Sequence, residues 1–260
     1  MKQFILPLEH DQGDTVDLTG EDFHYLAHVR RHQPGEVIPA RTPGGRALDL
    51  RIDDIGRDRL RGTLLPVTTA TADAAGTGPD ARPQIPPITL YQGLPKGKKL
   101  DTVVRQATEA GVQAIVPVRT SHSVVEWEGA RGAKKLERLE RIAREAAQQS
   151  GSVAPPRIAE IIDLNDIEPV SPEAGEVGLV FHEKPLAAQA LHEYLRTAPD
   201  HLYLAVGPEG GFSGDEITKL TDAKNFSVAR LGETVLRTET AALYAIAAVQ
   251  TILREREQWA

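Results

Sequence analysis

Residues 202–216 read LYLAVGPEGGFSGDE, and this run combines an apolar segment, a glycine-rich turn and a helix start. The segment Leu202–Val206 has the length and composition of a buried strand. Three glycines fall within the next five residues, and Ser213 and Glu216 have the spacing of a capping box. The run therefore predicts a strand, a turn where the backbone can come close to a ligand, and a helix.

Strand-like and helix-like segments alternate five times between residues 88 and 253. Such alternation predicts an α/β fold with a mostly parallel sheet flanked by helices. Ligands bind beyond the carboxyl ends of strands in these sheets, so we look for chemistry after Phe181, Val206 and Leu231. The predicted strand and helix pairs are residues 88–92 and 98–110, 113–118 and 133–149, 177–181 and 186–195, 202–206 and 214–223, and 226–231 and 239–253.

The chain before this region has a different composition. Residues 66–87 are rich in Pro, Thr, Ala and Gly, and their five prolines suit neither a helix nor a central strand. We therefore expect a small β-rich domain at 1–65, a linker at 66–87 and an α/β domain at 88–260. Within the first domain we predict one helix at 21–32 and strands at 36–40, 47–52 and 60–65.

Composition excludes several classes of protein. No cysteine is present among the 260 residues, which excludes disulfides, thiolate zinc sites and cysteine nucleophiles. The longest apolar run, residues 241–249, is far shorter than the ~20 residues that cross a bilayer, and the N-terminus lacks the apolar stretch of a secretory signal. We expect a cytoplasmic protein that does not associate with membranes.

The net charge of −7 would repel a polyanion at long range, so any nucleic-acid binding needs a local patch. Residues 24–62 supply eight arginines against five acidic residues, and arginine suits phosphate recognition. His24, His28 and His32 lie at i, i+4 and i+8 of the predicted helix, a spacing that permits metal binding. Arg30 and Arg31 would repel a cation there, so we expect no metal and a basic helix that faces phosphate.

Three segments could carry chemistry. The turn 207–211 (GPEGG) offers backbone amides to a ligand, although an ordinary turn between a strand and a helix fits its spacing equally well. The loop 231–241 (LGETVLRTETA) is long for such a turn and concentrates polar residues where a ligand would lie, unless Arg237 and Thr238 only cap a helix. The segment 181–184 (FHEK) is by itself more typical of a surface loop.

Two enzyme classes are disfavoured. The stretch 93–99 (GLPKGKK) lacks both the spacing and the hydroxyl residue of a Walker A loop. No strand candidate is followed by G-x-G-x-x-G with an acidic residue about 20 positions later, which argues against a nucleotide-dependent oxidoreductase.

The GPEGG turn, the S-x-x-E helix start and the LG-x-x-VLRTETA loop together resemble the SPOUT methyltransferases and, among these, the ribosomal RNA small subunit methyltransferase E family. The resemblance runs nearly end to end. In the N-terminal block, His24, Val29-Arg30-Arg31 and Gly35-Glu36 resemble a segment of that family's PUA-like barrel. The opening of its catalytic domain is matched by Lys96, Gln106, Glu109 and Gly111-Val112.

This resemblance implies S-adenosylmethionine-dependent methylation of N3 of a specific uridine in 16S rRNA of the small ribosomal subunit. It implies a PUA-like β-barrel, and a catalytic domain in which the last three strand-end loops form a deep trefoil knot. A homodimer is also implied, and the predicted last helix, apolar on nearly all sides, agrees with a second subunit. The residues on the RNA side would be His24, Arg30, Arg31 and Lys96. The cofactor residues would be Phe181, His182, Glu183, Gly207, Pro208, Glu209, Gly210, Gly211, Leu231, Gly232, Val235, Leu236, Arg237, Thr238, Glu239, Thr240 and Ala241.

Methylation at N3 of uracil requires loss of the N3 proton, so the site needs a base, or a cation that stabilises negative charge on the carbonyl oxygens. We assign Arg237 as the cation and Glu239, or else Glu209, as the proton acceptor. His122 and Ser152 stand where the family usually has arginine, which puts the RNA contacts in question rather than the cofactor pocket. The alternatives are a SPOUT enzyme with another target, such as the ribose 2′-oxygen or another base, and a catalytically silent RNA-binding protein.

Overall fold

The computed structural model describes residues 3–67, 85–123, 129–184 and 189–259, which belong to two compact units. The first unit comprises residues 1–81 with 147–155, and the second comprises residues 82–146 with 156–260. Most of the predicted linker, residues 68–84, lies outside the described residues. The first unit includes residues 147–155 because Gln3 donates hydrogen bonds to the carbonyl oxygens of Gln148 and Ser152.

The first unit contains a five-stranded sheet in the order β1-β3-β4-β5-β2. Only the pair β1–β3 is parallel. The core includes Leu50, Ile52, Leu60 and Leu64, all fully buried, and the burial of alternate residues matches the strand period. The three predicted strands are confirmed, whereas β1, only two residues long, and β2, which alternates exposed and buried residues, were missed. The strands are β1 (Phe4–Ile5), β2 (Thr15–Thr19), β3 (Val37–Arg41), β4 (Ala47–Ile55) and β5 (Arg59–Leu65).

The helix predicted at 21–32 is shorter and less regular than expected. A single turn of α-helix, α1 (Gly20–Phe23), continues as a π-helical turn, His24–Val29. The helix ends before Arg31, whose φ of 58° is left-handed. His32 therefore lies outside the helix, where its Nδ1 is 2.6 Å from the carboxylate of Glu36. The expectation of three histidines on one helical face is wrong.

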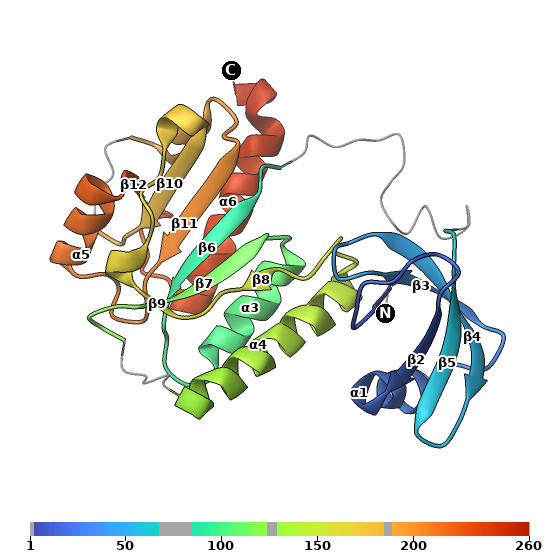
Figure 1. The fold of residues 1–260 in the computed structure, drawn as a ribbon. Coiled ribbons are helices and arrows are strands. Elements are labelled where there is room, and N and C mark those ends of the chain that lie inside the picture. Colours follow the sequence, from blue (N-terminus) through green and yellow to red (C-terminus); the bar gives the residue numbers. More distant parts are fainter. Residues whose placement is uncertain (1–2, 68–84, 124–128, 185–188, 260) are drawn as a thin grey trace. The chain divides into compact units, whose positions relative to one another are not determined.

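The second unit contains a seven-stranded sheet in which every pair is parallel, as the alternation of strands and helices predicts (Figure 1). The order is β12-β10-β11-β6-β7-β8, and β9 also pairs with β7. Phe181 is level with both Val206 and Ala229, so the carboxyl ends of β10, β11 and β12 meet at one edge. The strands are β6 (Ile88–Gly93), β7 (Ala114–Arg119), β8 (Arg157–Ile158), β9 (Ile162–Asp163), β10 (Glu176–Phe181), β11 (His201–Val206) and β12 (Phe226–Ala229).

Helices cover both faces of this sheet. Leu90, Leu179 and Leu204 pack in a cluster with α3 (Lys99–Glu109), α4 (Gly129–Ser150) and α6 (Thr238–Trp259). Their neighbours in sequence, Tyr91, Val180 and Ala205, belong to a cluster on the opposite face. That cluster includes residues of α5 (Gly214–Thr218) and of the π-helical turn Lys219–Ala223 that follows it. The alternation shows why these strands read as continuous apolar runs in the sequence.

One predicted helix of this unit is wrong. The helix expected at 186–195 is a short 3₁₀ helix, Leu191–Leu195, and residues 185–188 lie outside the described residues. Further 3₁₀ turns occur at Leu164–Asp166 and Pro172–Ala174. In the described part of the chain, no helix combines the length and apolar character needed to cross a membrane.

Candidate functional site

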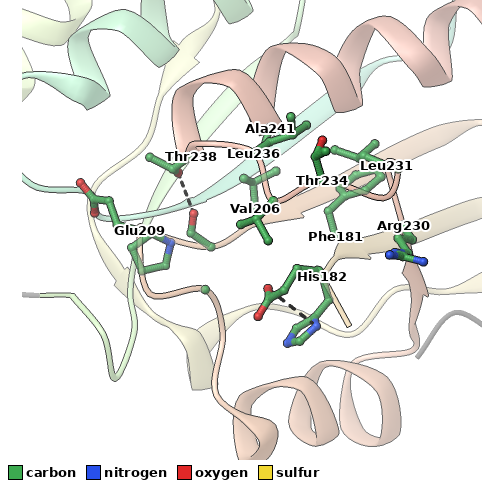
Figure 2. A pocket seen from close by; sticks show the side chains of 16 residues that line it. Phe181, His182, Val206, Glu209, Arg230, Leu231, Thr234, Leu236, Thr238 and Ala241 are labelled. Carbon is green, nitrogen blue, oxygen red and sulfur yellow. Dashed lines mark hydrogen bonds and ion pairs between the residues drawn. The ribbon is translucent and has the colours of Figure 1, made fainter. Parts of the chain in front are cut away.

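A pocket opens where β10, β11 and β12 end (Figure 2). Three strand-end segments line it: one follows β10, one contains the glycine turn after β11, and one leads from β12 into α6. Its position is the edge at which ligands bind in parallel α/β sheets. The lining residues are Phe181, His182, Glu183, Val206, Gly207, Pro208, Glu209, Gly211, Arg230, Leu231, Gly232, Thr234, Val235, Leu236, Thr238 and Ala241.

The glycine turn is folded tightly enough to require glycine at two positions. A Cβ on Gly207 would lie 2.9 Å from the Cα of Gly211, closer than real Cβ contacts allow. Gly211 has a φ of 67°, which is left-handed, and its amide donates to the carbonyl of Pro208 at 2.9 Å. The turn therefore needs glycine at both ends, while Pro208 and Glu209 between them also line this wall of the pocket.

A buried hydrogen-bond network joins three elements beneath the pocket. Thr238, the first residue of α6, donates from Oγ1 to the carbonyl of Gly207 at 2.7 Å. Gln92, fully buried in β6, donates from Nε2 to Thr238 Oγ1 at 2.9 Å. The network fixes the start of α6 against the glycine turn.

The predicted capping box at the start of α5 is present and extends further. Ser213 Oγ accepts from the amide of Glu216, whose carboxylate accepts from the amide of Ser213 at 2.8 Å and from that of Ser121 at 2.7 Å. Burial alone would raise the pKa of Glu216, but these hydrogen bonds outweigh it, and the pKa is lowered. The carboxylate thus ties the loop after β7 to α5.

His122 lies in that same loop and touches the glycine turn. Its Nδ1 is 3.1 Å from the carbonyl oxygen of Gly211, and a Cβ on Gly210 would lie 2.9 Å from the His122 side chain. The other departure from the family pattern, Ser152, accepts a hydrogen bond from Gln3 in the first unit. His122 is therefore part of the wall that surrounds the turn.

Most of the predicted cofactor residues line the pocket. Four of them are absent from its lining: Gly210, Arg237, Glu239 and Thr240. Three residues that do line it were not predicted: Val206, Arg230 and Thr234. Val206 immediately precedes the turn 207–211, and Arg230 immediately precedes the loop 231–241, so both lie just outside the motifs used for the prediction. Thr234 is one of the two unspecified positions of LG-x-x-VLRTETA.

The two residues assigned to catalysis lie beside the pocket rather than in its lining. Arg237 is exposed on the loop before α6. Glu239, in the first turn of α6, is half-buried, and its Oε2 is buried without a hydrogen-bond partner among the described residues. A carboxylate oxygen in that situation is costly unless something binds to it.

Glu209 is held by two contacts, one from the segment before α3 and one from the first residue of α3. Lys99 Nζ lies 2.7 Å from its Oε1, and the amide of Lys96 donates to the same carboxylate at 3.1 Å. Partial burial would raise the pKa of Glu209, but the hydrogen bonds from Lys99 and from backbone amides outweigh it, and the pKa is lowered. The carboxylate is thus kept ionised and is a weak base.

The residues assigned to RNA, His24, Arg30 and Arg31 in the first unit and Lys96 in the second, are all exposed. The arginine patch is smaller than the sequence suggests, because four of its eight arginines have partners inside the first unit. Arg41 is buried and donates to Gln3 and Gly45. The other three pair with aspartates: Arg46 with Asp11, Arg51 with Asp53 and Arg61 with Asp17.

No group of three His, Asp or Glu residues is placed to hold a metal ion among the residues that the structure describes. His24 and His28 are close, with ring centroids 5.4 Å apart, but His32 is bound to Glu36.

Comparison with known proteins places these features in a family. Residues 82–250 match the family described as RNA methyltransferase domain. The chain is 34% identical to the ribosomal RNA small subunit methyltransferase E of Mycobacterium bovis, over 92% of this chain and 87% of that protein. It is 28% identical to the Bacillus subtilis protein of the same name, over 99% of this chain and 100% of that protein.

Two solved structures are similar over nearly their whole length. One is the ribosomal RNA small subunit methyltransferase E from Neisseria gonorrhoeae bound to S-adenosyl methionine, with a TM-score of 0.80 and 29% identity, covering 97% of this chain and 98% of that one. The other is a methyltransferase from Legionella pneumophila in complex with SAM, with a TM-score of 0.81 and 26% identity, covering 96% and 97%. The family match, the high coverage and the pocket at the strand ends agree, and the chain belongs to the ribosomal RNA small subunit methyltransferase E family.

Proposed function

We propose that this protein transfers the methyl group of S-adenosylmethionine to N3 of a specific uridine in 16S rRNA. The observation that carries the proposal is the pocket at the carboxyl ends of β10, β11 and β12, whose walls are the two motif loops. Family membership supports the reaction, and the relatives solved with S-adenosylmethionine support the cofactor. A substrate in the small ribosomal subunit supports a cytoplasmic location.

The lining of the pocket fits this cofactor. Phe181, Val206, Leu231 and Leu236 provide apolar surface for the adenine ring. His182, Glu183, Glu209, Arg230, Thr234 and Thr238 supply polar groups for the rest of the cofactor. Gly207 lines the pocket, and because it carries no side chain, only its main-chain atoms are available to a ligand there. When bound, the cofactor would supply a methyl group attached to a positively charged sulfur. The sulfur is the leaving group when a nucleophile attacks the methyl carbon in line.

The protein contributes mainly position and charge. Holding the nucleophile in line with the methyl group lowers the barrier by removing the entropy of encounter. We assign Arg237, exposed at the start of α6, to stabilise negative charge on the uracil carbonyl oxygens. Glu239 has a carboxylate oxygen that forms no hydrogen bond with any described residue, which supports it as the acceptor of the N3 proton. Glu209 is the weaker candidate, because Lys99 and the Lys96 amide already occupy its carboxylate.

In our proposal the first unit is a PUA-like barrel that binds rRNA through its exposed arginines. Arg30, Arg31, Arg57 and Arg59 are exposed and form no ion pair with a described residue. Such contacts orient RNA through its phosphates, so binding should weaken steeply with salt. If Arg31→Ala leaves both methylation and its salt dependence unchanged, this surface is not the RNA-binding surface.

The proposal includes a deep trefoil knot formed by the three strand-end loops, and a homodimer. The second-subunit interface is supported by Tyr244, which is 51% exposed within the apolar stretch 241–249 of α6, and by Val235, which is 78% exposed. Light scattering on the purified protein tests the homodimer, and Tyr244→Glu should shift it toward the monomer.

The direct test of function uses labelled S-adenosylmethionine and small ribosomal subunits that lack the modification. Mass spectrometry of the digested RNA should identify N3-methyluridine. A ribose-methylated nucleoside, or one methylated at another base position, would support the cofactor assignment but show that the target is different. Cofactor binding without any product would show that the substrate is wrong, and absence of cofactor binding would refute the methyltransferase assignment.

Arg237→Ala separates catalysis from binding. If Arg237 stabilises charge in the transition state, the substitution should lower kcat far more than cofactor affinity. Equal losses would make Arg237 a binding residue.

A further inference from the structure

Glu209 joins two segments that are distant in the sequence. It belongs to the glycine turn and lines the cofactor pocket, while its two partners, Lys96 and Lys99, lie at the start of α3. The bond from the Lys99 ammonium is short, at 2.7 Å, and the Lys96 amide is 3.1 and 3.3 Å from the two carboxylate oxygens. Both oxygens are therefore used to hold the segment 94–99.

A second contact reinforces this junction. Gly93, the last residue of β6, lies directly against Pro208, and a Cβ on Gly93 would come within 2.5 Å of the proline ring. The chain therefore leaves β6 in contact with the glycine turn and is bound to that turn again through Glu209. A displacement of the turn must displace the segment 94–99 as well.

The junction leaves two lysine side chains facing solvent. Of the three lysines in the stretch 93–99, only Lys99 has its ammonium bound to Glu209. Lys96 is held through its backbone, and the side chains of Lys96 and Lys98 are exposed without an ion pair to a described residue. Two unpaired ammonium groups beside the cofactor pocket suit the phosphates of an RNA strand.

We propose that Glu209 is a positioning residue that holds the segment 94–99 against the glycine turn, so that cofactor binding and RNA binding at Lys96 and Lys98 are coupled. This inference rests on the proposed function and assigns to Glu209 a role other than proton transfer. A ligand that orders the turn also orders the lysine segment, and RNA then binds a preformed surface. Linkage makes the effect reciprocal, so bound RNA should tighten cofactor binding by the same factor.

Three variants test the coupling. Glu209→Gln keeps the size of the side chain but removes the charge that binds Lys99. Lys99→Met removes the partner, and Lys99 does not line the pocket. The control is Glu193→Gln, which removes a carboxylate that pairs with Arg196 at 2.8 Å; neither residue lines the pocket or contacts the segment 94–99.

The measurement is the affinity for a 16S rRNA fragment with and without S-adenosylhomocysteine, together with KM for RNA and kcat. In the wild-type protein S-adenosylhomocysteine should tighten RNA binding by about tenfold, within the usual range of coupling between sites. Glu209→Gln and Lys99→Met should each abolish this gain and raise KM for RNA about tenfold, and the double variant should be no worse than either. Glu193→Gln should keep the increase in RNA affinity that S-adenosylhomocysteine produces.

Other outcomes would overturn the proposal. If Glu209→Gln lowers kcat at unchanged KM for RNA and removes the acidic limb of the pH profile, Glu209 is the base. If S-adenosylhomocysteine tightens RNA binding as much in Lys99→Met as in the wild type, the ion pair between Lys99 and Glu209 does not couple the two sites. That conclusion would hold even if Glu209→Gln lost cofactor binding. A wild-type protein that fails to methylate any RNA would instead refute the proposed function.

Discussion

Thr238 donates a hydrogen bond from Oγ1 to the carbonyl oxygen of Gly207 at 2.7 Å, which joins the first residue of α6 to the first residue of the glycine turn. Both residues line the pocket, and the hydroxyl also accepts from the buried amide of Gln92. The two motif loops are thus parts of one wall. Their separation in the sequence conceals this relationship.

Thr238→Val should therefore destabilise the protein. Valine fills the same volume but removes the hydroxyl that binds both the Gly207 carbonyl and the Gln92 amide. The Gly207 carbonyl then keeps only a 3.4 Å contact with Gln92, so the loss should cost about 1 to 3 kcal/mol. Chemical denaturation measures the change in the free energy of unfolding, and calorimetry measures the accompanying loss of cofactor affinity. Thr251→Val, an exposed threonine of the same helix, is the control and should change stability much less. Equal effects of the two substitutions would contradict a special role for the hydrogen bond.

Gly207→Ala should abolish cofactor binding with a smaller effect on folding. The added methyl group would lie 2.9 Å from the backbone of Gly211, so the turn must open. Gly214→Ala is the matched control, because no atom lies within 4 Å of a Cβ at that position. Titration with S-adenosylmethionine should show wild-type affinity for the control. Retained affinity in Gly207→Ala would show that the turn does not contact the cofactor.

Glu216 should contribute to stability at neutral pH and lose that contribution in acid. Its folded-state pKa is lowered from the model-compound value of 4.5, so the unfolded carboxylate takes up a proton first as pH falls. The contribution is complete above 4.5 and disappears as pH falls through the lower, folded-state pKa. Glu216→Gln should destabilise by about 1 to 3 kcal/mol at pH 7 and by less at pH 3, which lies below the unfolded-state pKa of 4.5. Urea unfolding at both pH values checks this, and a difference independent of pH would contradict it.

Arg41 and Arg59 should separate stability from RNA binding. Arg41→Ala removes buried hydrogen bonds to Gln3 and Gly45 and should lower the free energy of unfolding by about 2 kcal/mol. Arg59→Ala should change stability by less than about 0.5 kcal/mol, because Arg59 is exposed and forms no ion pair with a described residue.

The salt dependence of RNA binding completes this comparison. If Arg59 contacts a phosphate, its loss should reduce the slope of log affinity against log salt by about 1. Arg41→Ala, measured under conditions in which the variant is folded, should leave this slope unchanged. A reversed pattern would place the RNA surface elsewhere.

Five strands of the second unit, β6, β7, β10, β11 and β12, could be predicted because each is a mostly apolar run bounded by turn residues. The capping box and the glycine turn could be predicted for a similar reason, since their geometry depends on residues within a few positions of one another. Short strands such as β1 and β8 carry too little pattern to be recognised. The histidine helix was mispredicted because a π-helical turn and the left-handed Arg31 interrupt the ordinary helical period.

By itself the sequence determined the order of elements, the parallel sheet and the two loops that carry the site, because hydrophobic period and turn chemistry are local properties. The tertiary structure decided which distant residues meet. It placed Gly93 against Pro208 and bound Glu209 to Lys99. It also buried Arg41, a charge that the sequence counts as available to RNA. Such contacts depend on where separate segments meet after folding, and no spacing along the chain records that.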